Sequence, residues 1–119
     1  MNVESTVDAP TVVAVVLTYN RRDLLRRCLE AIYRQTMAPT KVMVIDNAST
    51  DGTAEMLAQE FPSIDIRRLP ENTGYTGGMR AALTCPLGYD PKYIWFFDDD
   101  AIPLESCLGT LVKIGRAHV

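Results

Sequence analysis

The stretch "TVVAVVL", from Thr11 to Leu17, is a continuous run of β-branched and aliphatic residues. A run without polar alternation is typical of a strand that is buried on both faces of a parallel sheet. "KVMVID" (41–46) has the same character and predicts a second buried strand. Between them, "LLRRCLEAIYRQ" (24–35) predicts a helix. Its apolar residues recur at helical spacing and are expected to face inward: Leu24, Leu25, Cys28, Leu29, Ile32 and Tyr33. Strand and helix therefore alternate. This order predicts an α/β fold with a mostly parallel sheet, Rossmann-like and flanked by helices.

Further elements extend the same pattern. "IDIRRL" (64–69) predicts a short strand near an edge, and "KYIWFF" (92–97) predicts a fourth strand that carries its aromatic residues into the core. Met56, Leu57 and Phe61 predict the inward face of a helix that Pro62 ends. "NTGYTGG" (72–78) reads as a glycine-rich loop ahead of another helix, and Pro103 as the start of a last short helical stretch. We expect the sheet to be truncated after the fourth strand.

The bulk composition limits the class of protein. The chain has 119 residues, 47% of them hydrophobic and 23% charged, which fits one folded domain or part of one. A net charge of −3 gives no general attraction for nucleic acid. Three widely spaced cysteines indicate a reducing compartment, and no segment approaches the roughly 18–20 apolar residues that span a bilayer. We therefore expect a cytoplasmic protein without a membrane segment.

The two ends of the chain differ from the region between them. Residues 1–10 read as a loose lead-in without a basic signal-peptide region, and residues 11–112 as the folded unit. "KIGRAHV" (113–119) shows neither helical nor strand periodicity. It resembles one reading frame of a common short-read sequencing adaptor, with Lys113 at the junction. We interpret residues 113–119 as adaptor-derived, which would mean that the native gene continues past about Val112.

Four polar clusters each follow a predicted strand: "TYNRR" (18–22), "DNASTDG" (46–52), "NTGYTGG" (72–78) and "DDD" (98–100). In a parallel α/β sheet, ligands bind beyond the carboxyl ends of the strands. All four clusters would therefore lie at one rim, which predicts a binding site there.

The three consecutive aspartates carry the sharpest chemical signal. Adjacent carboxylates repel one another unless a cation neutralises them, although a solvated acidic turn is the simpler alternative. On an extended chain Asp98 and Asp100 point to one side and Asp99 to the other. We expect Asp98 and Asp100 to share Mg²⁺ or Mn²⁺, which carboxylates and phosphates bind together. Such a cation held against a diphosphate would assist the departure of a leaving group.

Two further clusters have both a binding and a structural interpretation. Asp46 ends a buried strand and could accept a hydrogen bond from a pyrimidine base or a ribose hydroxyl, or it could cap the next helix with Ser49 and Asp51. The glycines of "NTGYTGG" could admit an anionic ligand to a helix N-terminus, with Arg80 reaching a phosphate, or could form a plain turn.

Four motifs in order, "VVLTYNR", "VMVIDNASTDGT", "ENTGYTGG" and "WFFDDDAIP", resemble family 2 glycosyltransferases, the inverting enzymes of the glycosyltransferase A-type fold. The resemblance covers Thr11 to about Leu111 and is greatest to the rhamnosyl- and galactofuranosyltransferase branch, which builds bacterial cell-surface polysaccharides. It implies transfer of a sugar from a UDP- or dTDP-linked donor to a hydroxyl of a glycan or lipid-linked acceptor, with Mn²⁺ or Mg²⁺ as cofactor.

The resemblance also implies roles for individual residues. It places Thr18, Tyr19 and Arg21 in the nucleotide pocket, Asp46 on the base, and Asp98 on the sugar nucleotide and the metal. It places Asp100 on the metal as well, and it places four residues along the ribose and diphosphate: Asn72, Gly74, Gly78 and Arg80. Thr76 stands where the family often has alanine, which leaves the nucleotide preference open. The family's catalytic base follows the acidic motif, so this chain would hold the donor half of the site.

Three other functions fit parts of the pattern. A sugar nucleotidyltransferase would need a glycine-rich basic loop after the first strand, where "TYNRR" has no glycine. A Mg²⁺-dependent phosphate-handling protein would carry its key aspartate after that strand, where Thr18, Tyr19 and Asn20 stand. A nucleotide-binding fragment without catalytic activity is the third.

Overall fold

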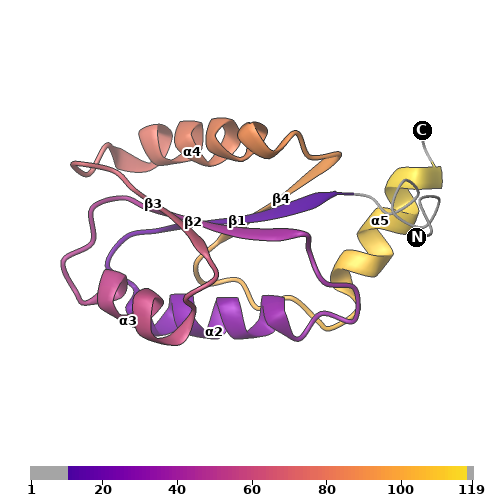
Figure 1. Ribbon diagram of the computed structural model, residues 1–119, viewed down its shortest axis with the longest axis horizontal. Helices are drawn as coiled ribbons and strands as arrows, with labels where there is room; N and C mark the ends of the chain where they lie inside the picture. The colour runs from indigo at the N-terminus through magenta and orange to yellow at the C-terminus, as the bar shows by residue number, and fades with distance from the viewer. Residues whose placement is uncertain (1–10, 118–119) are drawn as a thin grey trace.

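The computed structural model describes residues 11–117 and has a four-stranded sheet between helices (Figure 1). The predicted lead-in (1–10) and the last two residues of the predicted tail lie outside the described residues. The elements in chain order are β1 (Val12–Thr18), α2 (Arg22–Tyr33), β2 (Lys41–Asp46), α3 (Thr53–Glu60), β3 (Asp65–Arg68), α4 (Gly74–Thr84), the 3₁₀ helix η1 (Cys85–Tyr89), β4 (Tyr93–Asp98) and α5 (Cys107–Ala117). The predicted α/β class is confirmed.

Strand β1 is at the centre of the sheet and is buried along its whole length. The strand order is β3-β2-β1-β4 and every pair is parallel, with Val16 opposite Val44 on one side and Phe97 on the other. The prediction of buried strands at 11–17 and 41–46 is confirmed. The apolar run is continuous because both faces of β1 are covered by helices.

Two helical layers cover the two faces of the sheet (Figure 1). Ala14 and Val16 point into a cluster with α2 and α3, whereas Val13, Val15 and Leu17 point into a cluster with α4. In α2 the predicted inward residues Leu25, Cys28, Leu29 and Ile32 are fully buried. Leu24 and Tyr33, also predicted to face inward, are 40% and 49% exposed, because they flank the buried stripe.

The two outer strands are less buried than β1 and β2. The prediction that residues 64–69 form a short edge strand is confirmed by β3. The expectation that β4 carries all its aromatic residues into the core is wrong, because only one of them is fully buried. In β4 only Phe97 is buried and Ile94, Trp95 and Phe96 are half-buried, because no strand pairs with its outer side within the described residues.

The glycine-rich segment is not a loop ahead of a helix, as predicted, but the first turns of α4. Gly74 has a φ of +76°, which a glycine adopts at little cost. A Cβ on Gly78 would lie 2.7 Å from Leu17 Cδ1, so this glycine lets α4 approach the sheet closely.

The last helix begins later than predicted and continues further. It starts at Cys107 and not at Pro103, and buried Gln35 contacts both the connection between β4 and α5 and the first turn of α5. The Gln35 side-chain amide donates to the Leu104 carbonyl at 2.7 Å, and its oxygen accepts from Leu108 N–H at 3.0 Å. Residues 113–117 belong to α5 although their sequence shows no helical periodicity. Their proposed adaptor origin stays a prediction.

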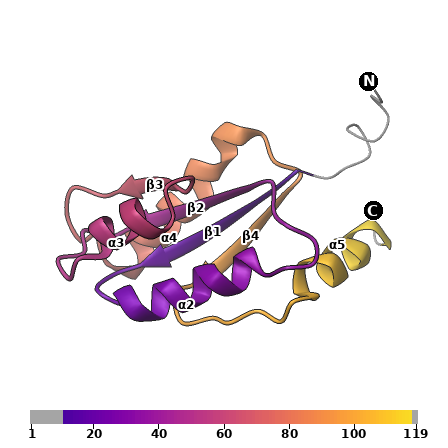
Figure 2. The ribbon, with the colours of Figure 1, turned by 60° about the horizontal axis from the view of Figure 1, so that its bottom comes forward.

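Helix α5 lies at the amino-terminal ends of the strands, opposite the rim that carries the polar clusters (Figure 2). Leu108 and Val112 pack there with Val12 of β1 and Tyr93 of β4. In residues 11–117 the structure contains no helix both long enough and apolar enough to cross a membrane.

Candidate functional site

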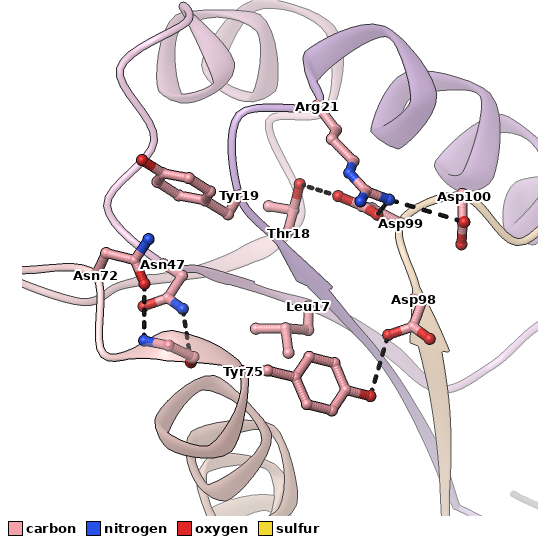
Figure 3. Close-up of a pocket in the computed structure, with 11 residues that line it drawn as sticks. Leu17, Thr18, Tyr19, Arg21, Asn47, Asn72, Tyr75, Asp98, Asp99 and Asp100 are labelled. Carbon is pink, nitrogen blue, oxygen red and sulfur yellow. Dashed lines mark hydrogen bonds and ion pairs between the residues drawn. The ribbon is translucent and has the colours of Figure 1, made fainter.

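The polar clusters meet at the carboxyl ends of the strands, where they line a cavity of about 460 Å³ (Figure 3). Strands β1, β2 and β4 end there, and α4 begins there. The lining residues are Leu17, Thr18, Tyr19, Arg21, Asn47, Asn72, Gly74, Tyr75, Asp98, Asp99 and Asp100. The structure thus brings together seven of the predicted site residues: Thr18, Tyr19, Arg21, Asn72, Gly74, Asp98 and Asp100.

Asp99 is the most buried of the three aspartates, at 5% exposure, and it faces the site. Its Oδ2 accepts a hydrogen bond from the Thr18 hydroxyl at 2.9 Å, and its Oδ1 lies 3.3 Å from Arg21 Nη1. Burial raises the pKa of the Asp99 carboxyl above its ordinary value, although the Thr18 hydroxyl and Arg21 oppose this shift. The expectation that Asp99 turns away from the site is wrong. The strand ends at Asp98 and the chain turns, with Ala101 N–H donating to the Asp98 carbonyl.

The two other aspartates are exposed and have different partners. The Tyr75 hydroxyl lies 3.5 Å from Asp98 Oδ1, whereas Asp100 Oδ2 lies 3.7 Å from Arg21 Nη1. Three carboxylates and one guanidinium give the cavity lining a net charge of −2. A negatively charged ligand would therefore need a cation at this wall.

The donor atoms fit a cation that is bound together with a substrate. The residues from 11 to 117 contain no group of three or more His, Cys, Asp or Glu side chains arranged to hold a metal ion. Mg²⁺ and Mn²⁺ prefer hard oxygen ligands, and Mg²⁺ typically takes only one or two carboxylates and completes its shell with phosphate and water. The exposed carboxylates of Asp98 and Asp100 fit such a shared site.

Asn47 lines the cavity although we did not single it out from the sequence. Its Nδ2 donates to the Gly74 carbonyl at 3.0 Å, and its Oδ1 accepts from Thr73 N–H at 3.0 Å. Asn47 therefore ties the end of β2 to the start of α4. Asn47 directly follows a buried strand and belongs to the same cluster as Asp46, and this sequence position could have identified it as a site residue.

Three predicted residues do not line the cavity: Asp46, Gly78 and Arg80. Asp46 is fully buried, and its carboxylate accepts from Ser49 N–H at 3.0 Å and pairs with Arg68 at 3.0 Å. Gly78 packs against Leu17, and Arg80 is exposed on α4. Their contacts with a nucleotide sugar stay predictions.

Asp51 fills the structural role that its sequence position indicates. Its Oδ1 accepts from Thr53 N–H at 3.2 Å, at the start of α3, and its Oδ2 accepts from Arg22 N–H at 2.9 Å, at the start of α2. One carboxylate thus accepts a hydrogen bond from a free N–H group at the start of each of two helices. Burial acts to raise the pKa of Asp51, but hydrogen bonds from the Thr53 hydroxyl and the two N–H groups outweigh it and hold the pKa below its ordinary value.

The sequence matches a family model over residues 13–117, and that family is described as "Glycosyl transferase family 2". Galactofuranosyltransferase GlfT1 from Mycolicibacterium smegmatis is 33% identical over 90% of this chain and 36% of its own length. The O-antigen chain rhamnosyltransferase RfbN from Salmonella typhimurium is 35% identical over 77% of this chain and 29% of its own length. The chain thus spans about a third of the length of these relatives.

Solved structures have the same fold. The mannosyltransferase PcManGT from Pyrobaculum calidifontis, solved with GDP-Man and Mn²⁺, is 29% identical with a TM-score of 0.71 over 87% of this chain and 32% of its own. TarS 1–349 from S. aureus is 22% identical, with a TM-score of 0.75 over 91% of this chain and 33% of its own, and therefore shows the fold alone.

Proposed function

The chain belongs to glycosyl transferase family 2, and from this premise we propose that the complete protein transfers a sugar from a nucleotide diphosphate sugar to a hydroxyl acceptor, with inversion at the anomeric carbon. The observation that carries the proposal is the single cavity in which Thr18, Tyr19, Arg21 and Asn72 face the acidic motif. The residues expected to contact the nucleotide and the aspartates expected to hold the cation then line one donor pocket.

Each part of the cavity would have its own task. Thr18, Tyr19 and Arg21 would contact the nucleotide, while Asn72 and Gly74 would lie along the ribose and diphosphate. Asp98 and Asp100 would hold Mn²⁺ or Mg²⁺ at the diphosphate. The bound cation would neutralise the charge that develops on the departing nucleotide. Asp99, fixed by Thr18 and Arg21, would keep the turn after β4 in position.

The reaction is a single displacement at the anomeric carbon. The oxygen of the acceptor hydroxyl forms a bond to that carbon as the bond to the diphosphate oxygen breaks, and the nucleotide diphosphate leaves with the electron pair. A base takes the proton of the acceptor hydroxyl. The resemblance places that base after the acidic motif, so we assign it to no residue of this chain.

The relatives support a donor class. GlfT1 and RfbN are named for galactofuranosyl and rhamnosyl transfer, which favours a UDP- or dTDP-linked donor and an acceptor in cell-surface polysaccharide. Use of a divalent cation is supported by PcManGT, whose structure holds Mn²⁺ with GDP-Man. We also propose a cytoplasmic location, which agrees with the absence of disulfides at Cys28, Cys85 and Cys107 in the described structure.

Calorimetric titration of the full-length protein with UDP and dTDP sugars, with and without Mn²⁺, tests this function. We expect saturable binding of one of the two donor types that weakens at least about tenfold when EDTA removes the cation, because the diphosphate would then face a lining of net charge −2. Binding of equal strength with and without the cation would contradict the metal-assisted mechanism. Absence of binding to either donor would contradict the donor class.

A further inference from the structure

Arg21 is the one basic residue that lines the cavity in the described part of the chain, and a single nitrogen of it lies near two carboxylates. Its Nη1 is 3.3 Å from Asp99 Oδ1 and 3.7 Å from Asp100 Oδ2 (Figure 3). With Tyr75 next to Asp98, each of the three carboxylates has a partner within the chain. The three carboxylates of the motif therefore contact groups on β1, α4 and the start of α2.

Arg21 lies at a backbone position that disfavours a positive charge. Arg21 is the N-cap residue of α2, at the positive end of the helix dipole, where a basic side chain is unfavourable. The acidic motif across the cavity offsets that cost. The Arg21 side chain is also 53% exposed and that of Asp100 57%, and ion pairs this open to water are weak. The guanidinium is therefore attracted to the motif but can be displaced from Asp100.

We propose that Arg21 is the resident counter-ion of Asp100 and that it competes with the divalent cation for this carboxylate, while its contact with buried Asp99 is structural. Arg21 is then a positioning residue that sets the affinity of the site for the cation. The inference rests on the proposed function, because that function supplies the cation. A guanidinium that leaves Asp100 still borders the same cavity, where its N–H groups can donate to diphosphate oxygens.

Mn²⁺ binding without nucleotide tests the proposal, with free Mn²⁺ measured by electron paramagnetic resonance. The full-length wild type is compared with Arg21→Gln and with Arg22→Gln. The control removes the same charge one residue further along, where Arg22 pairs with Asp23 at 3.4 Å and donates to the Asp51 carbonyl. We expect Arg21→Gln to bind Mn²⁺ about two- to fivefold more tightly, as the loss of a competing exposed ion pair predicts, and Arg22→Gln to match the wild type.

The outcomes separate this inference from the proposed function. Binding by Arg21→Gln alone, or tighter binding by Arg21→Gln than by the wild type, supports competition. Equal affinities in wild type and Arg21→Gln, or weaker binding by Arg21→Gln, overturn the inference while leaving the metal site intact. If neither protein binds Mn²⁺ in the absence of nucleotide, the inference is wrong, and the titration with donor and Mn²⁺ tests the shared metal site separately.

A second measurement uses the wild type, in which the positive charge of Arg21 is retained. In ¹⁵N-labelled wild type, Mg²⁺ should shift the Arg21 Nε–H resonance, which is identified by its loss in Arg21→Lys. The Arg22 resonance should stay in place. An Arg21 resonance that does not move at a Mg²⁺ concentration that saturates the site would overturn the inference.

Discussion

Asp99 is a buried carboxylate whose two oxygens have two different partners, the Thr18 hydroxyl and the Arg21 guanidinium. Thr18 ends the central strand and is 1% exposed, so its hydroxyl has a fixed position. An unpaired buried carboxylate oxygen is costly, and Thr18 therefore stabilises the turn after β4 as well as lining the cavity.

Replacement of Thr18 by valine tests the strength of this contact. The substitution keeps the β-branched shape but removes the donor to Asp99 Oδ2. We expect the free energy of unfolding at pH 7 to fall by about 1–3 kcal/mol, measured by urea denaturation. Thr84→Val is the matched control, because the exposed Thr84 hydroxyl donates only to the Arg80 carbonyl of its own helix. A loss no larger than that of the control would contradict a stabilising role for Thr18.

At the scale of elements, α2 and α3 are coupled at their N-termini through Asp51. Because the folded pKa of Asp51 is lowered, its charged form contributes stability above the unfolded-state pKa of about 3.9. That contribution is lost as the pH falls through the lower folded pKa.

Asp51→Ala should therefore be destabilising at neutral pH and much less so in acid. We expect a loss of about 1–2 kcal/mol at pH 5–7, typical of a removed N-cap and at the upper end because two helices share it. The difference from the wild type should shrink below about pH 4. Urea unfolding of both proteins at pH 7, 5 and 3 measures this difference in the free energy of unfolding. A difference that stays constant across this range would show that the charge of Asp51 contributes nothing.

Helix α4 is positioned by a close contact between Gly78 and β1. Gly78→Ala places a Cβ 2.7 Å from Leu17 Cδ1 and 3.2 Å from Asn47 Nδ2, so α4 or these side chains must shift. We expect a net loss of about 1–2 kcal/mol, since overpacking exceeds the gain in helix propensity. Gly109→Ala in α5 is the control and should be neutral or stabilising, because the nearest atom is Met37 Cβ at 3.8 Å. Equal thermal stability of the two variants would contradict the packing role of Gly78.

At the scale of the whole molecule, local sequence pattern was sufficient to predict the buried strands, the parallel sheet and the position of the site. The apolar runs at 11–17 and 41–46 predicted the buried strands, and the alternation with helices predicted the parallel sheet. Four clusters after four strands also predicted one rim, because parallel strands end on the same side.

The rest depended on information that is absent from local pattern. Strand order decides burial, so Trp95 and Phe96 on an edge strand are half-buried although their residue types suggested a core. The direction of Asp99 depends on a turn that begins one residue after the strand, which alternation could not predict. Glycines favour a loop in isolation, yet Gly78 lies within α4, at the point where this helix packs closely against Leu17.

The position of Trp95 makes the docking of α5 visible by fluorescence. Trp95 is the one tryptophan of the sequence, and it packs edge-on against Phe97 with ring centroids 4.3 Å apart. It also contacts both the core beneath α2 and the cluster that holds α5. The fluorescence of Trp95 therefore reports on the docking of α5. If α5 undocks while the central strands remain folded, the indole becomes exposed and its emission shifts to longer wavelength.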